Sequence, residues 1–228
     1  EAYRCGQRVF GENYVQELSV KSVDPLIAEM CPDIEWRLIG HIQTNKINQL
    51  LRVERLTAVE TIDSQKLAQS LEKALSQRGR ALDVMVQINS GQEDVKTGCH
   101  FSEAEALVRL IRTQCPHLKL LGLMTVGRLG HDWTDGPNPD FLALIESRRN
   151  ICLSLGVAEE SLKLSFGMTA DFEEAIGLGS DEVRVGTAVF GQRKYPIGVL
   201  THGKWDMSRY TDPQYLQLIR DNGLQTLK

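Results

Sequence analysis

Hydroxyl side chains and glycines recur together in two segments in the last third of the chain. The first segment holds Ser165, Gly167 and Thr169, and the second holds Gly186 and Thr187. Hydroxyls donate hydrogen bonds to anions, and glycine lets backbone N–H groups approach an anion closely. A helix expected to begin near residue 170 would add N–H donors at its start. The two segments suit a phosphate monoester, but ordinary strand-ending turns with an aspartate helix cap fit the same spacing.

Arg184 stands between two valines, Val183 and Val185, in an apolar run. Because side chains alternate across a strand, Arg184 would point away from the valines and share a face with Gly186. Inside a barrel, an unpaired guanidinium is costly. The sequence leaves two partners open for it, a ligand or a structural ion pair with an acidic residue such as Glu12.

Seven short apolar runs, rich in β-branched residues, predict strands that alternate with helical patterns such as 64–78 and 102–113. The runs cover residues 9–15, 36–42, 56–62, 82–89, 118–126, 163–168 and 182–190. No G-x-G-x-x-G opens the first helix, so the alternation favours a parallel β/α barrel of TIM type over an open doubly wound sheet. In such a barrel the loops after the strands share one face, where barrel enzymes place their sites.

Asn13 and His41 lie toward the ends of the first two predicted strands and therefore belong to the same face. We include both among the candidate cofactor contacts. Together with Glu12 they are also the aligned candidates for an acid or base, and none of the three is obviously paired. We therefore name no catalytic residue.

The composition excludes several classes of protein. The 228 residues carry a net charge of −4, which gives no global attraction for nucleic acid or an anionic membrane. No apolar stretch approaches the ~20 residues of a membrane-spanning helix, so we expect a soluble protein. Five scattered cysteines and five histidines show no metal-site spacing, which predicts reduced thiols, no metal and a cytoplasmic location.

Five sequence phrases in order resemble the pyridoxal phosphate homeostasis protein family. They are FGENYVQE at 10–17, LIGHIQTNK at 38–46, GLMTVG at 122–127, LSFGMTADF at 164–172 and VRVGTAVFG at 183–191. The resemblance implies a pyridoxal 5'-phosphate (PLP)-binding (β/α)8 barrel of the alanine racemase N-terminal type over residues 1–193. Residues 194–228 carry no family phrase and are expected to form a C-terminal tail, with a short helix near 212–221.

The resemblance also assigns roles. Ser165, Gly186 and Thr187 match the residues that hold the phosphate, and Arg184 matches the arginine that faces the pyridine nitrogen. The family's Schiff-base lysine lies at the end of its first barrel strand, in a phrase that this sequence lacks. The sequence opens inside the following helix, so we expect a missing N-terminal segment and a barrel without its first strand.

The implied function is that of a PLP buffer or carrier in vitamin B6 homeostasis, without catalytic turnover. Such a protein would be a monomer or weak homodimer that delivers cofactor to PLP-dependent apo-enzymes, in the cytoplasm or in mitochondria. The alternatives are a racemase-like PLP enzyme, another phosphate-ligand barrel enzyme, or an inert fragment.

Overall fold

Within the residues that the structure describes, seven parallel strands form one sheet whose spatial order follows the sequence, β1 to β7. The computed structural model describes residues 1–91, 97–128 and 130–191, so the predicted tail and its helix lie outside the described residues. The strands are β1 Val9–Glu12, β2 Glu35–Leu38, β3 Leu56–Ile62, β4 Leu82–Gln87, β5 Leu118–Met124, β6 Lys163–Met168 and β7 Glu182–Arg184. The predicted parallel β/α barrel is confirmed, as a nearly closed barrel.

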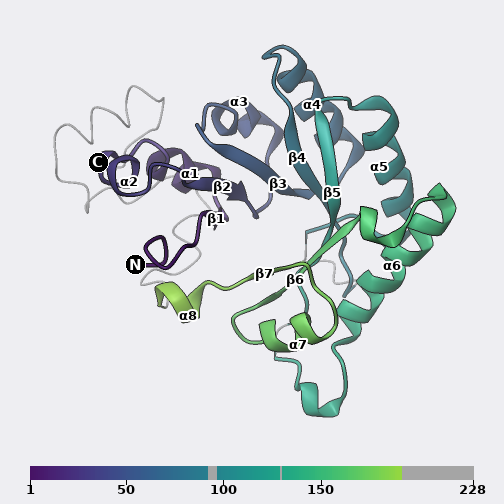
Figure 1. Cartoon of the computed structure of the whole chain (residues 1–228). Coiled ribbons are helices and arrows are strands. Elements are labelled where there is room, and N and C mark those ends of the chain that lie inside the picture. Colours follow the sequence, from purple (N-terminus) through teal and green to yellow (C-terminus); the bar gives the residue numbers. More distant parts are fainter. Residues whose placement is uncertain (92–96, 129, 192–228) are drawn as a thin grey trace.

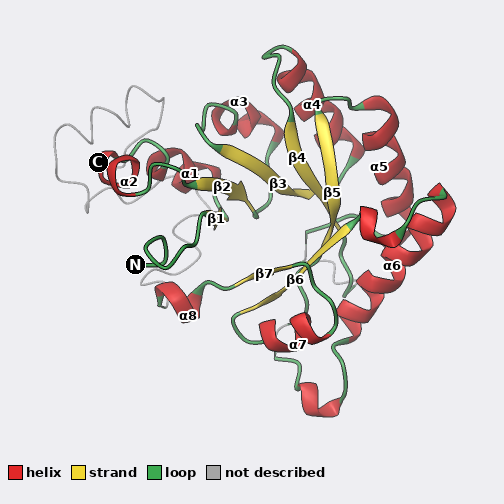
Figure 2. Ribbon diagram, in the orientation of Figure 1, coloured by secondary structure: helices red, strands yellow, loops and turns green. Residues whose placement is uncertain are grey.

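Helices cover the outside of the curved sheet (Figures 1 and 2). The α-helices are α1 Val15–Lys21, α2 Pro25–Met30, α3 Ile47–Leu50, α4 Gln65–Ser76, α5 Phe101–Gln114, α6 Pro139–Leu155, α7 Phe172–Gly177 and α8 Thr187–Phe190. Three short 3-10 turns accompany them, η1 Thr44–Lys46, η2 Trp133–Asp135 and η3 Glu159–Ser161. In the described part of the chain, no helix has the length and apolar character needed to cross a bilayer.

Helix α4 shows how local sequence sets these elements. The Ser64 hydroxyl accepts a hydrogen bond from the Leu67 N–H at 3.3 Å and so caps the helix start. Leu67, Leu71 and Leu75 recur every fourth residue and are all buried. This apolar stripe holds α4 against the outer face of the sheet.

Several strands end earlier than the apolar runs predict. The largest difference concerns residues 187–190, which form the one-turn helix α8 and not a strand. The N–H groups of Val189 and Phe190 both donate to the Gly186 carbonyl, which turns the chain out of the sheet directly after Arg184. The helix expected near residue 170 begins at Phe172. Strand β1 stops at Glu12 because α1 already begins at Val15.

The barrel has two different packing layers. Between strands and helices lies a continuous apolar cluster, in which the Phe141 and Phe166 rings are 4.6 Å apart. Met85 and Met124 are fully buried but lie outside this cluster. Charged and hydroxyl residues share the barrel interior with them, as described below.

The two end strands, β1 and β7, are not paired with each other among the described residues. Side chains bridge this seam instead. The Phe10 ring of β1 lies 6.4 Å from the Phe190 ring of α8, and also 6.4 Å from Trp36 of β2. An aromatic contact therefore brings the two ends of the sheet together without backbone hydrogen bonds.

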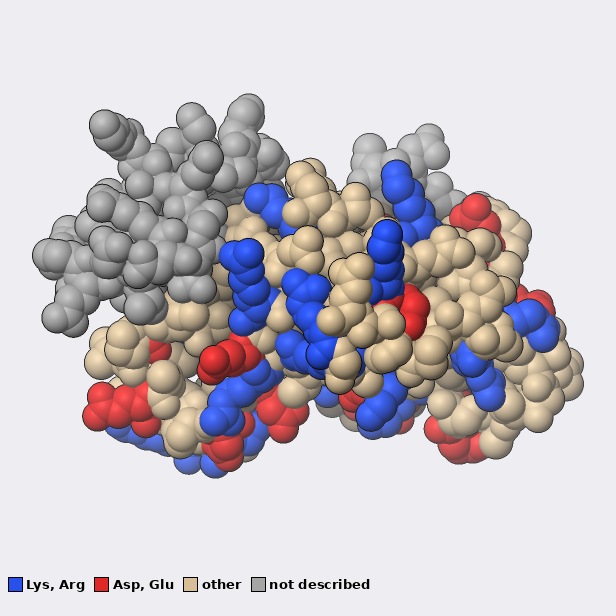
Figure 3. Space-filling view, turned by 90° about the horizontal axis from the view of Figure 1, so that it is seen from above, with Lys and Arg blue, Asp and Glu red and all other residues tan. Residues whose placement is uncertain are grey.

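Although the net charge is only −4, positive and negative side chains are unevenly distributed over the surface. Figure 3 shows Lys and Arg side chains gathered across the middle of the face seen from above, with Asp and Glu mostly toward its lower margin. The described residues contain no group of three or more His, Cys, Asp or Glu side chains placed to hold a metal ion.

Gly122 in β5 gives a test of the interstrand packing. A Cβ at this position would lie 1.9 Å from the Lys163 carbonyl oxygen of β6. We expect Gly122→Ala to lower the free energy of unfolding by about 3 kcal/mol, because neither backbone can move away. Urea denaturation measures the change.

Gly177→Ala is the matched control, because a Cβ there meets nothing within 4 Å and the residue is helical. It should leave stability unchanged or raise it by up to about 1 kcal/mol. Equal stability of the two variants would contradict the packing of β5 against β6.

Candidate functional site

Ser165, in the middle of β6, and Arg184, the last residue of β7, meet inside the barrel. The Arg184 guanidinium donates to the Ser165 hydroxyl at 2.6 Å and to the Thr125 carbonyl at 2.7 Å. The Thr125 hydroxyl is 2.7 Å from the Ser90 hydroxyl and donates to the Ile88 carbonyl. The prediction that Arg184 points into the barrel is confirmed, since Val183 packs against the outer apolar cluster.

Two carboxylates and a second arginine complete this interior group. Arg37 of β2 donates to Glu60 of β3 at 3.1 Å and also to Glu182 of β7. The second carboxylate oxygen of Glu60 accepts from the Ser165 hydroxyl at 3.2 Å. We call Arg37, Glu60, Ser165, Glu182 and Arg184 the interior cluster.

Burial sets the proton affinities in the interior cluster. Glu60 is wholly inaccessible to solvent, and this burial together with the neighbouring Glu182 raises its pKa to about 7, although both arginines oppose the shift. Burial also lowers the pKa of Arg184, while Glu60 and Glu182 counteract that effect. Each arginine is balanced by a nearby carboxylate, so the cluster is close to neutral when all four groups are charged.

Thr169, Gly186 and the start of α8 form a second group at the mouth of the barrel. The Thr169 hydroxyl oxygen accepts from the Gly186 N–H at 3.2 Å and from the Ala188 N–H at 3.4 Å. Two backbone donors thus converge on one oxygen, which is how an oxygen of a bound phosphate would be held. Gly186 and Thr187 are exposed, and a Cβ at Gly186 would meet nothing within 4 Å, so space for a ligand is present.

Gly167 has a packing role in this structure. Its φ is +99°, and a Cβ there would lie 2.4 Å from the Ala175 Cβ of α7. Asp171 occupies the cap position of α7 but makes no side-chain cap hydrogen bond; it accepts from the Met168 N–H instead. Gly167 thus permits the close turn that brings Thr169 to the mouth.

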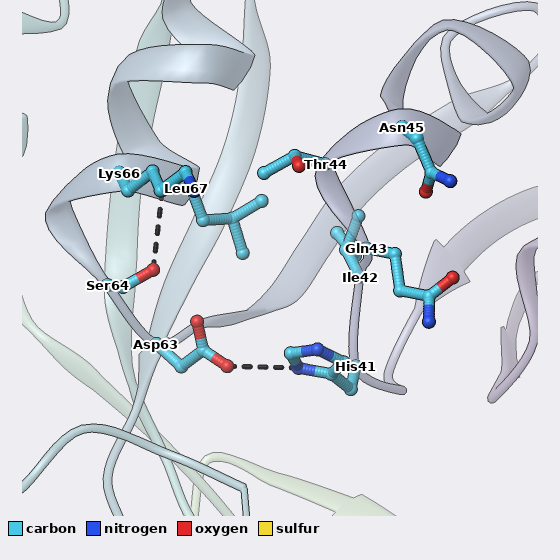
Figure 4. Close-up of a pocket in the computed structure, with 9 residues that line it drawn as sticks. All are labelled: His41, Ile42, Gln43, Thr44, Asn45, Asp63, Ser64, Lys66 and Leu67. Atoms are coloured by element: carbon cyan, nitrogen blue, oxygen red, sulfur yellow. Dashed lines mark hydrogen bonds and ion pairs between the residues drawn. The ribbon is translucent and has the colours of Figure 1, made fainter.

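Asn13 and His41 lie together at the ends of β1 and β2. A Cβ at Gly40 would be only 1.9 Å from the Asn13 carbonyl oxygen, so these two loops are in direct backbone contact. The His41 Nδ1 atom is 3.0 Å from an Asp63 carboxylate oxygen, across a shallow pocket between the loops after β2 and β3 (Figure 4). No hydrogen bond within the described residues joins Asn13 or His41 to the interior cluster.

The suggested ion pair between Arg184 and Glu12 is wrong. Glu12 faces the helical layer, where the Lys21 ammonium of α1 lies 2.5 Å from its carboxylate. The carboxylates near Arg184 are Glu60 and Glu182, with a weaker contribution from Asp171. Sequence reasoning missed the first two, along with Arg37. The sequence did contain a signal for Glu60. A single charged residue in a predicted strand such as 56–62 needs a partner when it is buried.

The donor set fits a phosphorylated heteroaromatic ligand. Backbone N–H groups and the Thr169 and Thr187 hydroxyls can surround a phosphate, and Arg184 precedes Gly186 by two residues.

Comparisons with known proteins define the class first. Residues 1–194 match the family described as alanine racemase, N-terminal domain. The solved alanine racemase of Clostridium difficile in complex with cycloserine superposes with a TM-score of 0.63 at 12% identity, over 84% of this chain and 50% of that one. The barrel is therefore of the alanine racemase N-terminal type.

More similar relatives narrow the assignment. The pyridoxal phosphate homeostasis protein of Mus musculus is 48% identical over 197 residues, which cover 86% of this chain and 72% of the mouse protein. The structure of PipY from Synechococcus elongatus with PLP bound has a TM-score of 0.71 at 27% identity, over 83% of this chain and 84% of that one. The chain belongs to the pyridoxal phosphate homeostasis protein family.

The Glu12–Lys21 pair predicts a pH-dependent stability. Burial raises the pKa of Glu12 from 4.5 to about 7 despite Lys21. A folded-state pKa above the unfolded one gives stability that is complete below pH 4.5 and is lost as the pH rises through 7. The free energy of unfolding of the wild type should therefore fall between pH 5 and 8. In Glu12→Gln this fall should be smaller by about 3 kcal/mol.

Urea denaturation of both proteins at pH 5 and pH 8 measures this difference. Because the pKa of Glu60 is also raised, the variant should still lose some stability between pH 5 and pH 8. An identical pH slope for wild type and variant would contradict the buried position of Glu12.

Proposed function

We propose that this chain binds PLP at the mouth of the barrel and acts as a buffer or carrier of the cofactor. The observation that carries the proposal is the convergence of the Gly186 and Ala188 N–H groups on one oxygen, with Arg184 two residues upstream. In this arrangement Gly186, Thr187 and Thr169 hold the phosphate, and Arg184 meets the pyridine ring. The relatives named as pyridoxal phosphate homeostasis proteins and the PLP-bound PipY structure support it.

Arg184 disfavours PLP chemistry that needs a strong electron sink, such as transamination. A guanidinium donates hydrogen bonds and stays protonated, so it stabilises a ring nitrogen that carries no proton. PLP supplies an aldehyde and an electron-withdrawing ring, and that ring withdraws electrons less strongly when its nitrogen is unprotonated. We therefore propose a non-catalytic protein that passes the cofactor to apo-enzymes in the cytoplasm or in mitochondria, and that is a monomer or a weak homodimer.

Ligand-induced stabilisation tests the binding proposal. A ligand that binds the folded state raises its stability, by about 2.7 kcal/mol at a concentration of 100 Kd. PLP should raise the melting temperature of the chain, and pyridoxal, which lacks the phosphate, should not at the same concentration. Equal shifts with both ligands would contradict phosphate recognition.

Thr169→Val tests the phosphate group of residues. Loss of the hydroxyl should raise the Kd for PLP about tenfold, because one hydrogen-bonding group at the phosphate is removed. Thr113→Val is the control, since Thr113 is exposed on α5 and its hydroxyl donates to the Arg109 carbonyl. Fluorescence titration gives both values, and an unchanged Kd for Thr169→Val would place the phosphate elsewhere.

A further inference from the structure

Glu60 occupies a bridging position in the interior cluster. One of its carboxylate oxygens accepts from Arg37 at 3.1 Å, and the other accepts from the Ser165 hydroxyl at 3.2 Å. The Ser165 oxygen in turn accepts from Arg184 at 2.6 Å. A continuous hydrogen-bonded path therefore runs from Glu60 through Ser165 to Arg184, and all of Glu60 and Ser165 is buried.

When Glu60 is ionised, chemistry fixes the direction of both hydrogen bonds that Ser165 makes on this path. A guanidinium has donors and no acceptor, so the Ser165 oxygen can only accept from Arg184. A hydroxyl has one proton, and the Glu60 carboxylate is the acceptor within reach of it. The Ser165 proton is thus directed into the barrel and away from a phosphate at the mouth. In this arrangement Ser165 connects Glu60 to Arg184.

The contacts also fix the orientation of the Arg184 guanidinium. Its two terminal nitrogens are held by Ser165 and by the Thr125 carbonyl, at 2.6 and 2.7 Å. A guanidinium carries five N–H donors, so three of them make no hydrogen bond within the described part of the chain. Arg184 as a residue is partly exposed, and these three donors are the ones that remain for a ligand.

We propose that Glu60 is a positioning residue that acts through Ser165 to orient Arg184 toward an unprotonated ring nitrogen of the ligand. The inference rests on the proposed function, because it concerns the same ligand. It adds the basis of selectivity, since the site would prefer a phosphorylated pyridine to a phosphorylated ring of the same shape without the nitrogen. It also assigns Ser165 to the recognition of the ring and not of the phosphate.

A pair of ligands separates this role from a structural one. PLP is compared with its analogue in which CH replaces the ring nitrogen, so that the phosphate and aldehyde are unchanged. Wild type should bind PLP about tenfold more tightly than the analogue, because only PLP can accept from Arg184. The Kd of each ligand is measured by fluorescence titration with the full chain, in wild type and in Glu60→Gln and Ser165→Ala.

Both substitutions should weaken PLP binding, about tenfold for Ser165→Ala and about fivefold for Glu60→Gln, whose amide oxygen still accepts from Ser165. Neither should change the Kd of the analogue by more than about twofold. The double variant should lose no more than Ser165→Ala alone, because both act through one guanidinium. Glu12→Gln removes a carboxylate that is also buried but lies outside this cluster, and it should bind both ligands like wild type.

Each other outcome overturns the inference in a recognisable way. Parallel losses for both ligands in Glu60→Gln would mean that Glu60 only supports the fold. A loss for both ligands in Ser165→Ala with none in Glu60→Gln would place Ser165 at the phosphate. Equal binding of PLP and the analogue by wild type would remove Arg184 from the ring nitrogen while leaving the proposed function intact. Binding of neither ligand by wild type would refute the proposed function, and the inference with it.

Discussion

Two guanidinium groups inside a parallel barrel are the constraint on which the rest of this structure depends. Removing a charge from water is expensive unless opposite charges and hydrogen bonds replace the solvent. Arg37 meets Glu60 and Glu182, and Arg184 meets Ser165 and a carbonyl oxygen. These contacts join strands β2, β3, β6 and β7 across the interior. Because these buried charged groups need partners inside the barrel, their contacts fix how the strands face one another.

In the proposed function, recognition of the ligand is divided between two layers of the barrel. At the mouth, exposed backbone N–H groups near Gly186 offer neutral donors suited to a phosphate. One layer deeper, Arg184 is held by the Ser165 hydroxyl, which also donates to Glu60, and by the Thr125 carbonyl. In the proposed function, the upper layer provides affinity for an anion and the lower layer distinguishes one ring from another.

The sequence predicted the number, order and parallel arrangement of the strands, because alternation of short β-branched runs with amphipathic helices is a local pattern. It also placed Arg184 inside the barrel, since its neighbours Val183 and Val185 have to face the other way. The extent of the last strand was wrong, because the hydrogen bonds of Val189 and Phe190 to the Gly186 carbonyl outweigh the β propensity of the segment. The partners of Arg184 could not be found in this way, as Glu60 lies 124 residues earlier and is brought near only by closure of the barrel.

Each strand of this sheet pairs with the strand that follows it in the sequence, from β1 to β7. Such a sheet can grow by adding one strand and one helix at a time, so its assembly can follow the chain as it leaves the ribosome. The loops closed at each step stay short, which keeps the entropy of closure small. Contacts across the interior are different, because Arg37 with Glu182 joins the second strand to the seventh, and Glu60 with Ser165 joins the third to the sixth. The barrel interior would then become electrically balanced only when β7 has been made and has joined the sheet.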